Sequence, residues 1–172
     1  MTLARGFPPV CRADARVLVL GSLPGAASLA RLEYYGHPRN AFWPLMGVLV
    51  GASPELPYAE RCERLRDARV ARVALWDVCA LARRPGSLDA AIEVASVVPN
   101  DFRAFFAAHP ALRCVFFNGA KAAGLYRRLV LPGLSPEAAA LEQRVMPSTS
   151  PAHAGRSLEA KQLAWQALVD VT

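Results

Sequence analysis

Four short apolar runs, rich in β-branched and aromatic residues, recur along the chain. They cover residues Arg16–Leu20, Val70–Val78, Arg113–Phe117 and, with a weaker pattern, Gln143–Met146. Runs of this length and composition predict buried β-strands. Every gap between them contains at least one stretch with the periodicity of a helix.

These helical stretches cover Phe42–Val50, Pro57–Ala68, Asp101–Ala108, Ala120–Val130 and Ser157–Val171. In the last of them, a buried stripe is expected from Leu158, Leu163, Trp165, Leu168 and Val169. Strands that alternate with helices favour right-handed crossovers and a parallel sheet covered on both faces. The pattern therefore predicts an α/β fold, a three-layer α/β/α sandwich around a central, mostly parallel four-stranded sheet.

Length and composition favour a single domain. A chain of 172 residues that is 53% apolar can close one core, so residues 1–172 are expected to form one unit. No apolar run approaches the roughly 18 residues of a membrane span, and residues 1–10 lack a signal-peptide core. We expect a cytoplasmic monomer without membrane contact. The four cysteines form no CxxC pair, which predicts reduced structural thiols and no metal.

The charge of the chain suits a polyanionic partner. Its net charge is +6 and its pI is about 9.6, and basic side chains bind nucleic acid by releasing counterions from the phosphates. The chain is also rich in arginine and alanine, and a coding bias would produce the same composition. Charge alone is therefore weak support. The basic segment Arg83–Ser87 either contacts a DNA backbone or is merely solvated.

Polar and glycine-rich residues stand at the end of every predicted strand. The first strand leads into Gly21–Gly25, the second ends at Trp76–Asp77, the third leads into Asn118–Gly119 and the fourth into Pro147–Ser150. Ligands of open parallel sheets bind outside the carboxyl ends of the strands. These segments are therefore expected to converge on one cleft.

The turn Gly21–Gly25 contains two glycines and a proline, so its backbone can approach a ligand closely and expose its amides. It matches neither the dinucleotide-binding fingerprint nor the P-loop. Taken alone, an ordinary strand-to-helix turn is the simpler interpretation. The segment Pro147–His153 is similarly open: its hydroxyls suit phosphate oxygens, and a surface turn with incidental serines explains it equally well.

The segment Tyr34–Trp43 combines four aromatics with a histidine, an arginine and an asparagine. Core segments rarely mix such polar groups with aromatics. An extruded base, in contrast, needs an aromatic face for stacking and amide or imidazole groups at its edge. The composition therefore favours a base-binding pocket, although Trp43 itself is more typical of a core.

Three of these segments together resemble the motifs of a known group of enzymes. They are Gly21-Ser-Leu-Pro-Gly25, Tyr35-Gly-His-Pro-Arg-Asn-Ala-Phe-Trp43 and Met146-Pro-Ser-Thr-Ser-Pro-Ala-His153. In order and separation they resemble the uracil-DNA glycosylase superfamily and, within it, the hypoxanthine-DNA (deoxyinosine) glycosylase family. The resemblance implies the three-layer fold, a double-stranded DNA partner that contains a deaminated base, and catalysis without metal or organic cofactor.

The resemblance also assigns roles to residues. Many superfamily members carry an Asp or Asn in the first motif that positions the attacking water, and the matching Leu23 cannot do so. In the hypoxanthine family this duty is attributed to the asparagine that matches Asn40. By similarity, Phe42 stacks under the base, Tyr35 forms a second wall, and Asp77 reads the edge of the base.

Further residues are expected around the base and the DNA backbone. The base pocket is expected to include Gly21, Ser22, Leu23, Pro24, Gly25, His37 and Asn118, and the DNA contacts to include Arg39, Ser148, Thr149 and Ser150. His37 and His153 are both catalytic candidates for stabilising the departing base, because Met146 stands where relatives often place a histidine. Ser150 matches the wedge that relatives insert into the duplex.

The predicted function is that of a monofunctional DNA glycosylase of base excision repair that releases hypoxanthine. Hypoxanthine offers an N1–H donor to Asp77 and an O6 acceptor to the turn amides. A lyase would need a poised lysine, and Lys121 and Lys161 both fall in predicted helices, so hydrolysis alone is expected. The alternatives are a uracil or G:U-mismatch glycosylase on the same scaffold, and a non-catalytic α/β module that binds nucleic acid.

Overall fold

The computed structural model describes residues 3–67 and 69–171, and a four-stranded sheet lies at its centre. The strand order is β3-β2-β6-β7, and all three pairings are parallel. The strands are β2 (Val17–Gly21), β3 (Val73–Asp77), β6 (Cys114–Asn118) and β7 (Glu142–Met146). The predicted parallel four-stranded sheet is therefore confirmed.

The strand β2 shows why each face of this sheet needs its own layer of helices. Successive side chains of a strand point to opposite faces. Val17 and Val19 pack into one apolar cluster, whereas Leu18 and Leu20 pack into another, and all four are fully buried. A strand that is apolar on both faces is stable only when helices cover both.

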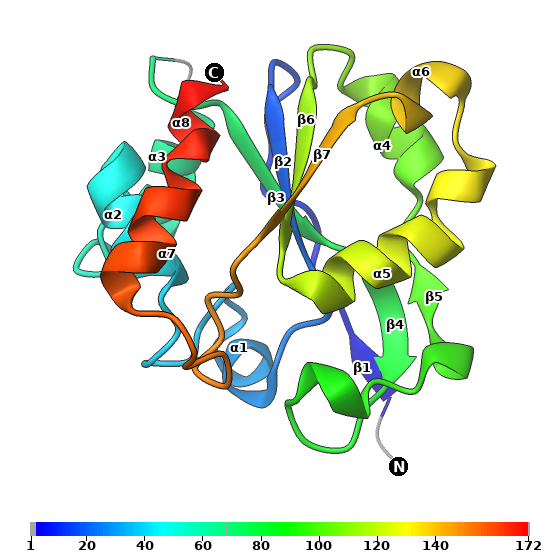
Figure 1. Ribbon diagram of the computed structural model, residues 1–172, viewed down its shortest axis with the longest axis horizontal. Coiled ribbons are helices and arrows are strands. Elements are labelled where there is room, and N and C mark those ends of the chain that lie inside the picture. The colour runs from blue at the N-terminus through cyan, green and yellow to red at the C-terminus, as the bar shows by residue number, and fades with distance from the viewer. Residues whose placement is uncertain (1–2, 68, 172) are drawn as a thin grey trace.

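Helices cover the two faces as the pattern predicted (Figure 1). One layer consists of α2 (Phe42–Val50), α3 (Tyr58–Arg66), α7 (Leu158–Trp165) and α8 (Ala167–Asp170). The other consists of α4 (Phe102–Ala108), α5 (Ala120–Leu129) and α6 (Pro136–Ala139), with the 3₁₀ turn η3 (Leu131–Gly133) between the last two. The three-layer α/β/α class is confirmed.

Some predicted boundaries and burial patterns differ from the structure. The second strand begins at Val73, because residue Val70 lies in an exposed turn. The second predicted helix ends at Arg66, and its expected end at Ala68 falls outside the described residues.

The predicted C-terminal helix is divided into α7 and α8, and part of its expected buried stripe is wrong. Trp165 and Leu168 are fully buried, but Leu158 is exposed and Leu163 is 80% exposed. Leu163 precedes Trp165 by two residues, which places it on the opposite face of the helix. Lys161, four residues before Trp165, takes the inward position instead.

A second, smaller sheet was not predicted. Its three strands are antiparallel in the order β1-β4-β5, with β1 (Leu3–Arg5), β4 (Cys79–Arg83) and β5 (Val98–Pro99). Its outer strands β1 and β5 are very short, so their apolar patterns carry little signal. Only Val78 separates β3 from β4, so the chain passes directly from the central sheet into the small one.

Three short elements remain. The helix α1 (Ala26–Arg31) follows β2, and the 3₁₀ turns η1 (Asp89–Ala91) and η2 (Val94–Ser96) lie between β4 and β5. The four cysteines are free, as predicted, and three of them are buried. Within residues 3–67 and 69–171, no helix combines the length and apolar character needed to cross a membrane.

Candidate active site

The predicted motif segments meet at the carboxyl ends of the parallel strands, the lower edge of the sheet in Figure 1. The register pairs Gly21 at the end of β2 with Asp77 at the end of β3. It pairs Asn118 at the end of β6 with Met146 at the end of β7. The topology thus brings together the segments that follow all four strands.

A carboxyl and a phenol crowd the backbone of Gly21. A Cβ added to Gly21 would lie 2.5 Å from Oδ1 of Asp77 and 3.0 Å from the hydroxyl oxygen of Tyr35. Any side chain here would displace these groups, so the position requires glycine. Within the described part of the chain, Oδ2 of Asp77 and the hydroxyl of Tyr35 are buried without a hydrogen-bond partner. Native proteins contain few such unpaired buried groups, and two of them meet here.

Burial also changes the acidity of Asp77, which is only 3% exposed. Desolvation and, to a smaller extent, the nearby Asp89 raise the pKa of its carboxyl to about 7, and the Arg84 guanidinium opposes the rise. A carboxyl with this pKa exchanges its proton near neutral pH, which is typical of functional groups. Asp77 therefore combines an unpaired oxygen with a titration in the working pH range.

The aromatic pair differs from the prediction in one respect. Phe42 is 0% exposed and packs among Tyr35, Trp43 and Trp165, so its ring offers no face to a base. Tyr35 covers it, with ring centroids 4.2 Å apart and planes inclined by 30°. Tyr35 is itself partly exposed although its hydroxyl is buried. The expected roles are therefore reversed: Tyr35 presents the aromatic surface, and Phe42 supports it from behind.

Asn40 lies where α2 begins. Its Oδ1 accepts a hydrogen bond from the backbone N–H of Phe42 at 2.9 Å, which fixes the side chain against the first turn of the helix. Its Nδ2 has no acceptor among the described residues, and the residue is half-buried. One hydrogen bond to Oδ1 thus holds Asn40 in place. The second lone pair of Oδ1 and the two Nδ2 hydrogens remain available to a ligand.

The neighbouring histidine has a defined tautomer in its neutral form. Nδ1 of His37 accepts a hydrogen bond from the backbone N–H of Arg39 at 3.1 Å. The ring proton must therefore lie on Nε2. The Arg39 side chain is exposed at the same corner. His153, the other candidate, is exposed, and its backbone carbonyl accepts a hydrogen bond from Nζ of Lys161 at 2.6 Å.

Asn118 and Thr149 tie the third motif to the sheet and to the second motif. The amide of Asn118 donates to Oγ1 of Thr149 at 2.8 Å and accepts from its backbone N–H at 2.9 Å. The carbonyl of Thr149 in turn accepts from the N–H of Ala41 at 2.9 Å. Thr149 is 1% exposed, so the expected DNA contact by its hydroxyl is wrong for this structure. Both residues act as a buried clamp.

The serines on either side of Thr149 remain available to a ligand. Ser148 and Ser150 are half-buried. Their hydroxyl oxygens accept hydrogen bonds from the N–H groups of Ser150 and Ala152, at 3.1 and 3.2 Å. Because each hydroxyl is an acceptor in these bonds, its hydrogen is still free to donate to a phosphate.

Sequence reasoning missed the buried segment that supports the first motif. Arg84 is 7% exposed; its guanidinium donates to the carbonyl of Leu23 at 3.2 Å and to that of Pro24. Ser22 donates to Oδ1 of Asp89 at 2.5 Å. Neither interpretation of the segment Arg83–Ser87 was therefore right for Arg84, which binds the protein's own backbone. The small sheet, which the sequence did not reveal, is what brings this segment under the turn.

These contacts orient the backbone of the first motif. The carbonyls of residues 21 and 22 accept from the amides of Val78 and Cys79, and the carbonyls of residues 23 and 24 accept from Arg84. A trans peptide points its N–H away from its carbonyl, and the described residues contain no cis bond. The N–H groups of residues 22, 23 and 25 therefore point away from Val78, Cys79 and Arg84, respectively, each opposite the carbonyl of its own peptide. The side chain of Leu23 packs into the core.

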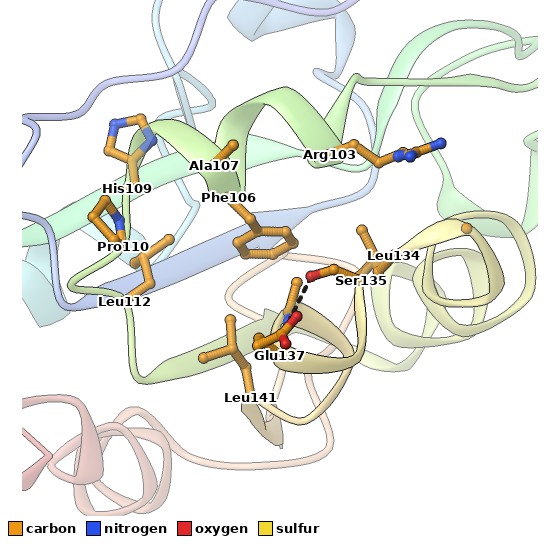
Figure 2. A pocket seen from close by; sticks show the side chains of 12 residues that line it. Arg103, Phe106, Ala107, His109, Pro110, Leu112, Leu134, Ser135, Glu137 and Leu141 are labelled. Atoms are coloured by element: carbon orange, nitrogen blue, oxygen red, sulfur yellow. Dashed lines mark hydrogen bonds between the residues drawn. The ribbon is translucent and has the colours of Figure 1, made fainter.

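Two cavities of the molecule lie away from these residues. Figure 2 shows a cavity of about 520 Å³ at the amino ends of β6 and β7, lined by residues such as Phe106, His109, Leu112 and Leu141. A second, of about 560 Å³, lies behind the first motif between the N-terminal strand and α1. Asn40, Tyr35 and Asp77 line neither of them.

Across the described residues, no three His, Cys, Asp or Glu side chains group as a metal site would require.

Comparison with known proteins places this arrangement in a family. The model of the Uracil DNA glycosylase superfamily matches residues 8–169 of the chain. This match covers all three motifs and both layers of helices. The chain therefore belongs to the uracil DNA glycosylase superfamily.

Two relatives and one solved structure narrow the similarity. The chain is 35% identical over 162 residues to "Hypoxanthine DNA glycosylase" of Methanosarcina barkeri, covering 94% of each chain. It is 35% identical over 167 residues to a protein of the same name from Methanosarcina acetivorans, covering 96% of this chain and 98% of that one. A candidate uracil DNA glycosylase of M. acetivorans, solved by NMR, superimposes with a TM-score of 0.75 at 32% identity, covering 97% and 99% of the two chains. The resemblance to hypoxanthine DNA glycosylases is thus confirmed.

Proposed function

We propose that the protein is a hydrolytic DNA glycosylase that releases hypoxanthine from DNA in base excision repair. Relatives named hypoxanthine DNA glycosylase, similar over nearly the whole chain, support the class of reaction. The observation that carries the proposal is the unpaired Asp77 carboxyl, buried beside Gly21 and Tyr35 where all motif segments meet. A buried acceptor and a set of outward-pointing amides form the pattern that a purine edge would satisfy.

Asp77 and the turn distinguish hypoxanthine from adenine in this proposal. The ionised carboxyl accepts a hydrogen bond from N1–H of hypoxanthine, and the amides of residues 22, 23 and 25 donate to O6. Adenine presents an unprotonated N1 and an amino group at the same positions, so both contacts would become repulsive. Leaving a buried polar group unpaired in this way strongly disfavours the wrong base.

Tyr35 and Asn40 serve the extruded nucleoside. The exposed part of the Tyr35 ring stacks on the base, and Phe42 keeps that ring in place. Oδ1 of Asn40 has a second lone pair beyond the one bound to the Phe42 amide, and this lone pair accepts a hydrogen bond from the attacking water. His37, with its Nε2–H, is better placed than the exposed His153 to stabilise the departing base, because it lies in the same segment as Tyr35 and Asn40.

The DNA partner is a duplex that contains a deaminated base. Arg39, Ser148 and Ser150 supply a cation and two hydroxyl donors next to the motifs. The hydrogen bond between Ala41 and Thr149 holds their two segments side by side. Phosphate contacts of this kind position a duplex without reading its sequence.

The proposal is tested with duplex oligonucleotides that contain a single deoxyinosine, deoxyuridine or deoxyxanthosine. Abasic sites are revealed by strand cleavage in alkali. We expect release of hypoxanthine by the wild-type protein, and a loss of about a hundredfold or more in the Asn40→Ala variant with DNA binding retained. The matched control is Gln166→Ala, which removes an exposed amide between α7 and α8, outside the three motifs, and should leave the rate unchanged.

Other outcomes favour the remaining candidates. Uracil also presents an N–H donor to Asp77, and the solved relative is described as a uracil DNA glycosylase, so faster release of uracil would make uracil the principal substrate. Strand scission without alkali would contradict a purely hydrolytic reaction. Binding of these duplexes with no release of any base would leave a non-catalytic nucleic-acid module and overturn the proposal.

A further inference from the structure

The segment under the first motif places a buried cation and a carboxylate beside the base-reading group. Arg84 donates to the backbone carbonyls of Leu23, Pro24 and Gly86. Asp89, at the start of η1, accepts from the hydroxyl of Ser22. No carboxylate lies within 4.0 Å of the Arg84 guanidinium among the residues described by the structure, so its bonds there go only to backbone.

The charges of this cluster do not balance when every group is ionised. Arg84 contributes one positive charge, whereas Asp77 and Asp89 together contribute two negative charges. In a buried region of low dielectric, one cation neutralises one carboxylate, and the second tends to keep its proton. Asp77 is the more buried of the two carboxyls, and Asp89 is partly exposed, so the proton resides on Asp77.

The other titratable groups around Asp77 are neutral near pH 7. They are Tyr34 and Tyr35 from the second motif and Cys79 from β4. Burial raises the pKa of both phenols and raises the pKa of the Cys79 thiol to about 12. The charges that act on Asp77 therefore come from Arg84 and Asp89.

We propose that Arg84 and Asp89 are positioning residues that set the protonation state of Asp77 and thereby the class of base edge that the site accepts. Ionised Asp77 accepts from a ring N–H, as in hypoxanthine, xanthine and uracil. Protonated Asp77 no longer prefers such an edge. Arg84 and Asp89 act through opposite charges, and both also hold the turn whose amides face the base. This inference rests on the proposed function, because it concerns the same site.

Substitutions can separate the effect of the charges of Arg84 and Asp89 from the effect of their hydrogen bonds to the turn. Asp89→Asn removes the negative charge but keeps an oxygen that accepts from Ser22. Arg84→Gln removes the positive charge, whereas Arg84→Lys keeps it and loses the planar fork that reaches several carbonyls. Arg83→Gln removes the same charge from an exposed side chain one residue earlier and is the matched control.

Two measurements report on Asp77 in each variant. The first is the pH dependence of kcat/KM for release of hypoxanthine, which follows the free enzyme's groups. The second is the NMR titration of the Asp77 carboxyl carbon in the free protein, which does not depend on activity. Because the ionised form is the acceptor, kcat/KM should rise as pH passes through the midpoint.

The expected midpoints move in opposite directions. Asp89→Asn lowers the midpoint by about one pH unit, and Arg84→Gln raises it by a similar amount. Arg84→Lys lowers the rate without moving the midpoint, and Arg83→Gln leaves the midpoint unchanged. Equal midpoints in all variants, or shifts in the same direction, would overturn the inference. If Arg84→Gln does not fold, the isosteric Asp89→Asn variant tests the inference alone. A midpoint equal to that of the wild type would then refute the inference.

The two proposals fail separately. If the wild-type protein releases no base, the proposed function is lost, whatever the carboxyl titration shows. If it releases hypoxanthine but the titration of Asp77 is the same in Asp89→Asn and Arg84→Gln, the function stands and the role of the cluster is refuted.

Discussion

The two ends of the central sheet are built from the same strands but differ in their polar groups. At the carboxyl ends, Asp77 and Tyr35 each bury a polar atom without a partner, beside a glycine that leaves them room. At the amino ends lies the cavity of Figure 2, which His109 lines. There Nδ1 of His109 lies 2.7 Å from the carbonyl of Phe105, and its ring stacks on the Phe105 ring at 4.1 Å. His109 thus ends α4, as its position before Pro110 suggests.

Unpaired buried polar groups therefore locate the candidate site better than the volume of a cavity does. The cavity at the amino ends is lined largely by apolar side chains such as Phe106, Leu112 and Leu141. At the packed carboxyl ends, by contrast, the unpaired carboxyl costs desolvation free energy. A ligand that forms a hydrogen bond with it offsets this cost. Substitutions at the amino end should therefore change stability alone, and those at the carboxyl end should change chemistry.

A large loss of stability is expected from Phe106→Ala at the amino end. Phe106 packs against the rings of Phe102 and Phe105, and removing it from the core should lower the free energy of unfolding by about 3 kcal/mol. Urea unfolding measures this loss. The rate of hypoxanthine release per folded molecule should stay that of the wild type, and a fall in that rate would show that the two ends are coupled.

Asp77→Asn should have the opposite pattern, a gain in stability with a loss of chemistry. The carboxyl has a pKa of about 7 in the folded protein against an ordinary value of 3.8, so the folded state holds the proton more tightly. The wild type therefore loses stability as pH rises from about 4 to about 7, and the variant does not. The gain should reach at most about 4 kcal/mol at alkaline pH and vanish in acid.

Urea unfolding of both proteins at about pH 4 and about pH 8 checks this prediction. Release of hypoxanthine should fall in the variant and lose its dependence on pH near neutrality. A stability difference that does not change with pH would mean that Asp77 titrates normally.

Tyr35→Ala should reduce kcat/KM for hypoxanthine release by about tenfold to a hundredfold, because stacking of a base on an aromatic ring contributes about 1–3 kcal/mol. Tyr35→Phe keeps the ring and removes a hydroxyl that has no partner among the described residues. Its rate should stay within about threefold of the wild type, without loss of stability. Equal rates for Tyr35→Ala and the wild type would argue against the stacking role.

The smallest effect is expected from a pair of exposed arginines, one at each end. Arg39→Gln should reduce the slope of log K for DNA against log salt by about one and weaken binding uniformly across sequences. Arg103→Gln, on the rim of the cavity in Figure 2, should leave both quantities unchanged. A titration by fluorescence anisotropy at several salt concentrations measures them. An equal change in both variants would mean that DNA contacts the two ends alike.

Much of the site was visible in local sequence. The motif from Tyr35 to Trp43 and the glycine turn carry recognisable chemistry, and the alternation of strands and helices placed them at one edge of a sheet. The reversal of Tyr35 and Phe42 was not visible. Both are aromatic residues in one short segment, and only packing against Trp43 and Trp165 decides which ring is covered.

Tertiary contacts also decide which polar residues of the third motif are buried and which are accessible. Thr149 stands between two serines with similar chemistry, yet its hydroxyl is buried against Asn118 while the serines stay accessible. A shift of the loop by one residue would place a serine in the buried position and leave the Thr149 hydroxyl accessible. No property of the three side chains themselves distinguishes them.

The sequence by itself determined the class of fold, the order of its strands along the chain and the residues that could do chemistry, because periodicity and motif composition are local. The tertiary structure decided which polar atoms are left without partners and which charges act on them. Arg84 and Asp89 influence Asp77 only because the short strand β4 brings them under the turn at Gly21. Electrostatic coupling depends on distance and burial in space, and neither is encoded in the spacing of residues along the chain.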